Sequence, residues 1–211
     1  GLGDVYKRQT QLDQLLATGT TRWAVNLFRP QQPLREGERQ AAADVAAAEG
    51  VKLAGADYSF GWDFKLDLAL GAPTPPRVVW AMFGTFTSDE TERIHDRGAE
   101  AWVTVTSPAE ARAAAEAGAD VLCVQGPDAG GHRGIWDEYA EPDQRALPEL
   151  VRACQVGVPL LAAGGLRTAE DVAWVLGLPG VAAAVCGSAF LLADEAGTSP
   201  ANREMLSKGG P

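Results

Sequence analysis

Short apolar runs rich in β-branched residues alternate along the chain with longer, alanine-rich stretches of helical period. This alternation is typical of a parallel sheet whose strands are joined by crossover helices. Six runs are predicted as strands, namely residues 23–27, 77–82, 101–105, 121–125, 159–163 and 181–186. Helices are predicted over residues 36–49, 88–97, 108–117, 147–155 and 168–176. The pattern therefore predicts an α/β protein.

Capping signals support three of these helix boundaries. Ser88 supplies a capping oxygen before two acidic residues, and Gly98 follows the last turn of that helix. Ser107 places a hydroxyl before a proline at the first helical position, and Gly118 follows the last turn of the same helix. Thr168 precedes two acidic residues in the same manner. These signals agree with the boundaries that the hydrophobic period predicts.

Three parts of the chain depart from the alternation. Residues 50–76 carry several aromatic side chains among Gly, Asp and Pro without a sustained period, and we expect an irregular insertion there. Within it, Trp62 and Phe64 are expected to cover a substrate cavity. Residues 1–9 show no clear period and are expected to be a leader foreign to the protein, and residues 207–211 a truncated tail.

Composition narrows the class of protein. The 211 residues include 18 Lys and Arg against 28 Asp and Glu, a formal net charge of −10, which argues against nucleic acid or an anionic membrane as partner. No apolar run approaches the roughly 20 residues of a spanning helix. Together, the charge and the lack of a spanning run lead us to expect a cytoplasmic enzyme. Cys123, Cys154 and Cys186 lie too far apart for a metal motif or disulfide framework, so we expect small buried thiols and no metal site.

Six alternating strands suit either an open doubly wound sheet or part of an eightfold barrel. Both folds place ligands at the carboxyl ends of the strands. No Gly-x-Gly-x-x-Gly follows a predicted strand, and no Gly-x-x-x-x-Gly-Lys-Ser/Thr occurs. The absence of these phosphate-binding loops favours the partial barrel.

The loop after the fourth predicted strand carries the most informative chemistry. Residues 125–134 read QGPDAGGHRG, and their four glycines permit a close approach of backbone to a ligand. His132 on this loop suits a general base or an anion donor, although a solvated histidine on an ordinary turn explains it equally well. Gln125 closes an apolar strand, so its amide needs a partner that a bound ligand would supply.

Two later strand ends resemble a phosphate site. Gly164 and Gly165 follow one strand, and Gly187 and Ser188 follow the next, so that backbone amides are exposed beside helix starts. Tight turns without a ligand are the alternative. Asn26 lies in an apolar run on the same edge, where a buried amide needs a partner. His95 is expected to be a solvated helix residue without a role.

Together these motifs resemble those of the nitronate monooxygenases, formerly called 2-nitropropane dioxygenases. The resemblance covers about residues 22–206 and rests on the 125–134 loop, on residues 160–166 and 187–191, and on the strand around Asn26. Asp128 stands where the family commonly has Glu, and Ser188 where Thr is usual. Family barrels begin with two further strands before the one that bears the Asn, so six strands here and two missing ones make eight.

The resemblance implies an FMN enzyme on a (β/α)8 TIM barrel, present here as a partial flavin-binding barrel over residues 10–206. It would oxidise alkyl nitronates or nitroalkanes with O2 to a carbonyl compound and nitrite, with His132 as catalytic base or anion stabiliser. Gln125, Gly130 and Gly131 would lie against the flavin and Asn26 would hydrogen-bond to it. The flavin phosphate would be held by Gly164, Gly165, Gly187 and Ser188.

Two other functions remain open at this stage. Enoyl-acyl-carrier-protein reductases of the same flavin barrel superfamily carry a similar Gly-Gly-His loop, although Arg133 after the histidine is more like the monooxygenases. A flavin-free barrel that binds a phosphorylated metabolite, or an inactive fragment, is the second alternative.

Overall fold

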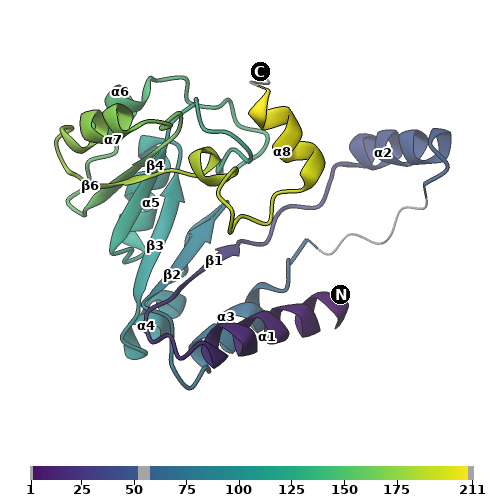
Figure 1. Cartoon of the computed structure of the whole chain (residues 1–211), viewed down its shortest axis with the longest axis horizontal. Helices are drawn as coiled ribbons and strands as arrows, with labels where there is room; N and C mark the ends of the chain where they lie inside the picture. Colours follow the sequence, from purple (N-terminus) through teal and green to yellow (C-terminus); the bar gives the residue numbers. More distant parts are fainter. Residues whose placement is uncertain (1, 52–57, 209–211) are drawn as a thin grey trace.

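The computed structural model describes residues 2–51 and 58–208, and for residues 2–8 the backbone alone. Six parallel strands form one sheet in the order of the sequence (Figure 1). The strands are β1 (Ala24–Phe28), β2 (Val78–Met82), β3 (Glu100–Val105), β4 (Val121–Gln125), β5 (Leu160–Ala163) and β6 (Val181–Val185). All six predicted strands are confirmed, with ends that differ by one residue at most.

Helices follow the strands as crossover connections and flank both ends of the chain. They are α1 (Leu2–Ala17), α2 (Glu36–Ala48), α3 (Trp62–Leu70), α4 (Ser88–Asp96), α5 (Pro108–Glu116), α6 (Leu147–Ala153), α7 (Ala169–Leu176) and α8 (Pro200–Ser207), with a 3-10 turn η1 (Ser188–Phe190). The five predicted helices are α2, α4, α5, α6 and α7. Most of them lie against the sheet, whereas α2 extends away from it (Figure 1).

The predicted caps of α5 and α7 are present, whereas the prediction that Ser88 caps α4 is wrong by one residue, because the Thr87 hydroxyl accepts from the amide of Glu90 at 3.2 Å. The Ser107 hydroxyl accepts a hydrogen bond from the amide of Glu110 at 3.2 Å, and the Thr168 hydroxyl accepts one from the amide of Asp171 at 3.2 Å. Each bond satisfies an amide that the first turn of a helix leaves without a partner.

The expected irregular insertion at residues 50–76 is wrong in part, because α3 lies within it. Trp62, Leu66, Ala69 and Leu70 are buried at the i, i+4, i+7 and i+8 spacing of one helical face. Alternating charged and exposed aromatic side chains on the other face hid this period in the sequence. Residues 52–57 of the insertion lie outside the described residues.

The ends of the chain are also helical where the sequence indicated none. The helix α1 begins at Leu2 and so includes most of residues 1–9, and it contacts α3. Whether those residues are foreign to the protein stays a prediction. Residue 207 ends α8, and residues 209–211 lie outside the described part of the chain.

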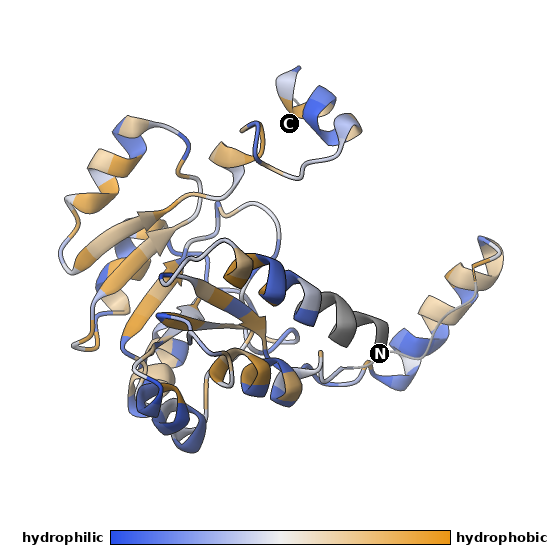
Figure 2. Cartoon of the chain, turned by 60° about the horizontal axis from the view of Figure 1, so that its bottom comes forward, coloured by the Kyte–Doolittle hydropathy of each residue, from blue (hydrophilic) through white to orange (hydrophobic). Residues whose placement is uncertain are grey.

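The sheet carries apolar side chains on both faces, which explains why its strands read as nearly continuous apolar runs. One face packs against the helices through a large buried cluster whose strand members include Val79, Ala101, Val103, Leu122, Val124, Leu160 and Ala162. Figure 2 shows the apolar colour along the strands and both apolar and hydrophilic colours along the helices. The core therefore lies between the sheet and its crossover helices.

The opposite face of the sheet would be the interior of a barrel. Val121, Cys123, Leu161 and Ala163 are buried there, with Trp80 and Trp102 packed against them. The two indole rings meet edge to face with centroids 5.5 Å apart. Among the described residues, β1 and β6 each pair on one side only, so the six strands form an open segment rather than a closed barrel.

The cysteines follow the prediction with one difference. Cys123 and Cys154 are buried, and burial raises the pKa of each thiol to about 12. Cys186 is only partly buried. In the described residues, no helix combines the length and hydropathy that a bilayer span requires.

We expect Ile94→Ala to lower the free energy of unfolding by about 2–5 kcal/mol, because the side chain is fully buried between α4 and the sheet and its removal leaves a cavity. Urea titration followed by circular dichroism measures the change. Val45→Ala on α2 is the matched control, since Val45 is 64% exposed. Equal losses in the two variants would contradict this description of the core.

Candidate functional site

Gln125 connects the end of β4 to the loop that carries His132. Its side chain is 8% exposed, its Nε2 donates to the backbone carbonyl of His132 at 3.0 Å, and its Oε1 accepts from the amide of Gly134 at 2.6 Å. The loop itself therefore supplies the hydrogen-bond partners that we expected a bound ligand to supply. The amide retains one further donor and acceptor capacity for a bound group.

Glycine is required where this loop meets the neighbouring strand ends. A Cβ on Gly134 would lie 2.8 Å from Cγ2 of Thr104, and a Cβ on Gly130 would lie 2.9 Å from Oγ of Ser188. Gly164 has a φ of +114°, and its Cβ would lie 3.1 Å from the carbonyl oxygen of Gly126. The glycine-bearing ends of β4, β5 and β6 thus converge at one edge of the sheet.

The residues that the sequence assigned to a phosphate present open backbone amides. Gly165, Gly187 and Ser188 are exposed, and a Cβ on Gly187 would meet nothing within 4 Å. Among the described residues, the amides of these three donate to no protein acceptor. Backbone amides without a protein acceptor, at the ends of neighbouring strands and at the start of a helical turn, are donors of the kind that a phosphate needs. The side chain of Asp128 lies beside Gly165, since a Cβ on that glycine would be 3.0 Å from the Asp128 Cβ. These residues, with Gly164, are called the phosphate cradle below.

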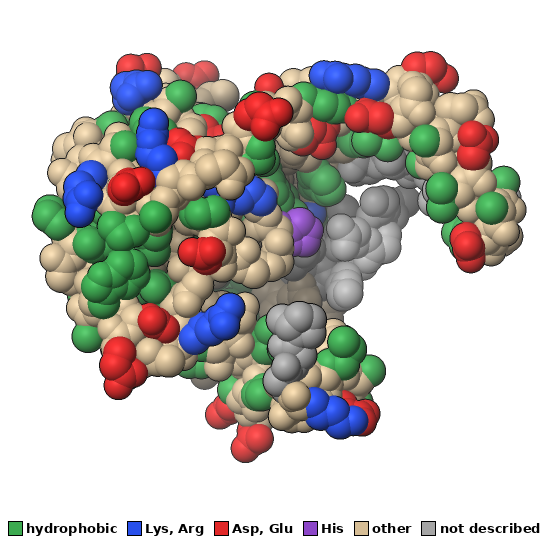
Figure 3. Space-filling model, turned by 90° about the horizontal axis from the view of Figure 1, so that it is seen from above, with side chains coloured by type: hydrophobic (Ala, Val, Ile, Leu, Met, Phe, Trp, Pro, Cys, Tyr) green, Lys and Arg blue, Asp and Glu red, His purple; other side chains and the backbone are tan. Residues whose placement is uncertain are grey.

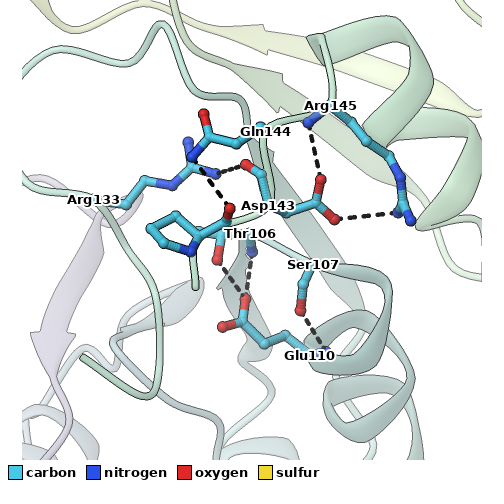
Figure 4. A network of polar contacts seen from close by, with 8 residues as sticks. Thr106, Ser107, Glu110, Arg133, Asp143, Gln144 and Arg145 are labelled. Carbon is cyan, nitrogen blue, oxygen red and sulfur yellow. Dashed lines mark hydrogen bonds and ion pairs between the residues drawn. The ribbon is translucent and has the colours of Figure 1, made fainter. Parts of the chain in front are cut away.

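Glu110 supports the site from beneath through a buried carboxylate (Figure 4). Its Oε2 accepts from the amide of Thr106 at 2.5 Å and from the Thr106 hydroxyl at 2.9 Å. Its Oε1 accepts from the amide of Trp136 at 3.0 Å, and the Trp136 indole donates to the carbonyl of Thr104 at 3.0 Å. One carboxylate therefore fixes the end of β3, the start of α5 and the segment that follows His132.

Arg133 connects the same loop to the segment before α6. Its Nη2 donates to the carbonyl of Asp143 at 3.1 Å, and the Asp143 carboxylate lies 3.2 Å from the Arg145 guanidinium (Figure 4). The Nε and Nη1 atoms of Arg133 are buried without a hydrogen-bond partner among the described residues. The side chain next to His132 is thus turned into the protein rather than toward the open edge.

The ring of His132 is exposed and lies beside two phenylalanines at the ends of β1 and β2. Its centroid is 6.1 Å from that of Phe28 and 5.9 Å from that of Phe83. The view from above shows a hollowed face in which a histidine side chain is visible (Figure 3). A titratable ring with an apolar flank and open access is available for proton transfer or for binding an anion.

The prediction that Trp62 covers a cavity is wrong. Trp62 is 2% exposed, its indole donates to Glu90 Oε1 at 2.6 Å, and the Arg29 guanidinium lies 4.2 Å over its ring. Arg29 also donates to both oxygens of Glu90, at 2.8 and 2.9 Å. Trp62 is a structural residue, because its indole contacts both members of this ion pair. Phe64, in contrast, is 39% exposed.

Burial by itself raises the pKa of the Glu90 carboxyl, but its partners outweigh burial and the pKa is lowered. These partners are hydrogen bonds from the Thr87 amide and the Trp62 indole, together with the charge and hydrogen bonds of Arg29. The carboxylate form is therefore the one that the fold stabilises.

Two further residues differ from their sequence-based description. Asn26 is exposed rather than buried, because β1 is an edge strand in the described chain, and its Nδ2 donates to the carbonyl of Trp80 at 3.4 Å. His95 is exposed but not free, since its Nε2 lies 2.8 Å from Oδ2 of Asp120. That carboxylate also accepts from the amide of Ala101, so His95 has a structural contact.

Sequence reasoning missed Phe28, Phe83, Glu110 and the Arg29–Glu90 pair. Phe28 ends β1, and Phe83 and Gly84 directly follow β2. A glycine just after a strand is the same signal that identified the glycines after β5 and β6. No local signal identifies Glu110, because one of its partners, Trp136, lies 26 residues away.

Comparisons with known proteins agree with the fold. A family model described as nitronate monooxygenase matches residues 6–210. The chain is 33% identical over 193 residues to a nitronate monooxygenase of Pseudomonas aeruginosa, covering 86% of this chain and 54% of the relative. It therefore spans about half the length of that curated relative.

Two solved structures extend the comparison. A nitroalkane oxidase from Streptomyces ansochromogenes superposes with a TM-score of 0.82 at 34% identity, over 94% of this chain and 59% of the other. FabK from Thermotoga maritima superposes as an M276A mutant with a TM-score of 0.68 at 19% identity, over 97% of this chain and 56% of the other, which shows the fold alone.

We expect Gln125→Leu to accelerate hydrogen exchange at the Gly134 amide by roughly tenfold or more, because a buried amide loses its acceptor at a cost of about 1–3 kcal/mol. Amide exchange followed by NMR measures it. Gln144→Leu is the control, since that exposed side chain bonds only to the nearby carbonyl of Pro142 among the described residues. Unchanged protection of Gly134 in the Gln125 variant would contradict the clamp.

We expect the difference in free energy of unfolding between the wild type and Glu90→Gln to depend on pH. The folded pKa of Glu90 lies below its ordinary value of 4.5, so the carboxylate stabilises the fold above about pH 4.5 and loses this effect as the pH falls through the folded pKa. Urea midpoints of both proteins between pH 3 and 7 measure the difference, in which the other carboxylates cancel. A difference that stays constant with pH would contradict the ion pair's contribution.

Proposed function

The chain belongs to the nitronate monooxygenase family, and we propose that the protein it represents uses FMN and O2 to oxidise alkyl nitronates or nitroalkanes to a carbonyl compound and nitrite. The observation that carries the proposal is the position of His132, an exposed ring on a loop that Gln125 fixes to the sheet. The open amides of the phosphate cradle lie on the same edge.

The residues at this edge suit the cofactor that the family uses. The phosphate cradle would hold the FMN phosphate through the amides of Gly165, Gly187 and Ser188 and through the Ser188 hydroxyl. Gln125, Gly130 and Gly131 would lie against the flavin, and Asn26 would hydrogen-bond to it from β1. When bound, FMN supplies the redox chemistry between the substrate and O2.

His132 would act on the substrate in one of two protonation states. The neutral imidazole accepts the proton from the carbon next to the nitro group of a nitroalkane, which yields the nitronate. The protonated imidazole donates a hydrogen bond to an oxygen of a nitronate that is already anionic and holds it in place. Because Gln125 binds the His132 carbonyl, the backbone stays fixed while the ring is free to reach the substrate.

The enoyl reductase alternative is distinguished by its substrates. Monooxygenase activity consumes O2 with a nitronate, whereas the reductase oxidises a reduced nicotinamide with a crotonyl thioester. The identity of 33–34% to a nitronate monooxygenase and a nitroalkane oxidase supports the first. If the protein retains no FMN after incubation with it and shows neither activity, the flavin-free alternative is supported.

We expect His132→Asn to abolish turnover of neutral nitroalkanes while retaining bound FMN, because Asn has no basic nitrogen and leaves the backbone contacts of Gln125 intact. Oxygen consumption measures turnover, and visible absorption after gel filtration measures FMN. His95→Asn is the control, since His95 contacts Asp120 on the helix side of the sheet. Loss of FMN with the His132 variant would assign the residue a structural role instead.

A further inference from the structure

The segment that follows the phosphate cradle folds back on itself around one arginine. After β6 the chain passes through η1 and a loop, residues 191–199, into α8. Arg203 on α8 donates to four backbone carbonyls of this loop. Its Nε donates to Thr198 at 3.3 Å and its Nη1 to Leu192 at 3.1 Å, and its Nη2 donates to Ala193 at 2.6 Å and to Ala196 at 2.7 Å.

This segment has little apolar packing of its own to order it. No residue of η1 or α8 is buried, and Figure 2 shows the C-terminal helix apart from the sheet. Leu191 and Leu192 in the loop are 39% and 45% exposed. Segments with few buried apolar contacts open locally at low cost in free energy. We therefore expect the hydrogen bonds of Arg203 to set the conformation of the loop.

Backbone hydrogen bonds connect the loop to the phosphate cradle. The amide of Phe190 donates to the carbonyl of Gly187 at 3.1 Å, and the amide of Ala193 donates to the carbonyl of Phe190 at 3.1 Å. The Ala193 carbonyl in turn accepts from Arg203. Fixing Ala193 therefore restricts the turns that begin at Gly187 and Ser188.

The shape of the guanidinium, rather than its charge, explains these contacts. Among the described residues Arg203 forms no ion pair, and the neighbouring carboxylate of Glu204 pairs with Lys208 instead. A guanidinium presents five N–H donors in a rigid plane, so it can reach four carbonyls placed around its edge. A lysine ammonium has its three donors on one atom and cannot span the same acceptors.

We propose that Arg203 is a positioning residue for the phosphate cradle, because it holds the loop after η1 and so keeps the amides of Gly187 and Ser188 in one orientation. The inference rests on the proposed function, in which the cradle holds the FMN phosphate. Donors that are already ordered bind an anion more tightly, since less conformational entropy is lost on binding. The Arg203 side chain bonds only to backbone carbonyls in the described residues, so it would act through the backbone rather than by contact with the ligand.

The effect on the loop is measured first without a ligand. Arg203→Met keeps an apolar stem and removes the donors, so we expect hydrogen exchange at the Phe190 and Ala193 amides to accelerate by roughly tenfold or more. Exchange at the fully buried Leu122 in β4 should not change. Arg152→Met on α6 is the matched control, because the Arg152 side chain is exposed and has no partner in the described part of the chain. Unchanged exchange at both loop amides in the Arg203 variant would overturn the proposal.

The effect on the phosphate cradle is measured by titrating FMN and riboflavin and following flavin fluorescence. We expect Arg203→Met to weaken FMN on the order of tenfold and to leave riboflavin unchanged, because only the phosphate meets the cradle. A general loss of structure would weaken both flavins and lower the urea midpoint. Arg203→Lys keeps the charge without the planar set of donors, so we expect it to resemble Arg203→Met.

The outcomes separate this inference from the proposed function. If the wild type prefers FMN to riboflavin and Arg203→Met keeps that preference, the inference fails and the proposed function stands. Full FMN affinity in Arg203→Lys, with loss in Arg203→Met, would show that the charge acts instead of the positioning and would also overturn it. If the wild type binds neither flavin, the proposed function fails, and the inference fails with it.

Discussion

The pair of hydrogen bonds made by the Gln125 amide fixes the chemistry of this edge to the sheet. One side chain at the last position of β4 holds the backbone on both sides of Arg133, through the carbonyl of His132 and the amide of Gly134. A glycine-rich loop has high conformational entropy, and a buried amide is one of the few groups that satisfies a donor and an acceptor at once. The position of the His132 backbone therefore follows from the strand rather than from the loop sequence.

Other parts of the site are likewise held in place by hydrogen bonds from polar side chains. Glu110 fixes the segment after the loop through Thr106 and Trp136. The Arg29–Glu90 pair joins the segment after β1 to α4. These carboxylates have their hydrogen bonds satisfied within the protein, so they add rigidity without placing a free charge beside the histidine. What faces the open side is backbone amide on one flank of His132 and phenyl ring on the other.

The strands could be predicted because parallel strands that are buried on both faces form continuous apolar runs. Most helices could be predicted because Ser, Thr and Gly at their ends mark where they begin and end. The helix α3 was missed because its buried face, Trp62 and Leu66 among others, is interrupted by Asp, Lys and an exposed Phe. The loop from Gln125 to Gly134 was indicated by its composition. The roles of Trp62 and Glu110 were not, because both depend on partners brought close only by the fold, and the positive φ of Phe83 has no sequence signature apart from the glycine that follows it.

Comparison of FMN with riboflavin binding tests most directly the claim that this edge holds a phosphorylated flavin. The two ligands share the ring system and differ in the phosphate, so flavin fluorescence quenching on titration with the protein isolates the contribution of Gly165, Gly187 and Ser188. The account predicts FMN binding that is weakened by more than about tenfold when the phosphate is absent, in line with the loss of several charge-assisted hydrogen bonds. Equal affinity for the two flavins, or binding of neither, would contradict it.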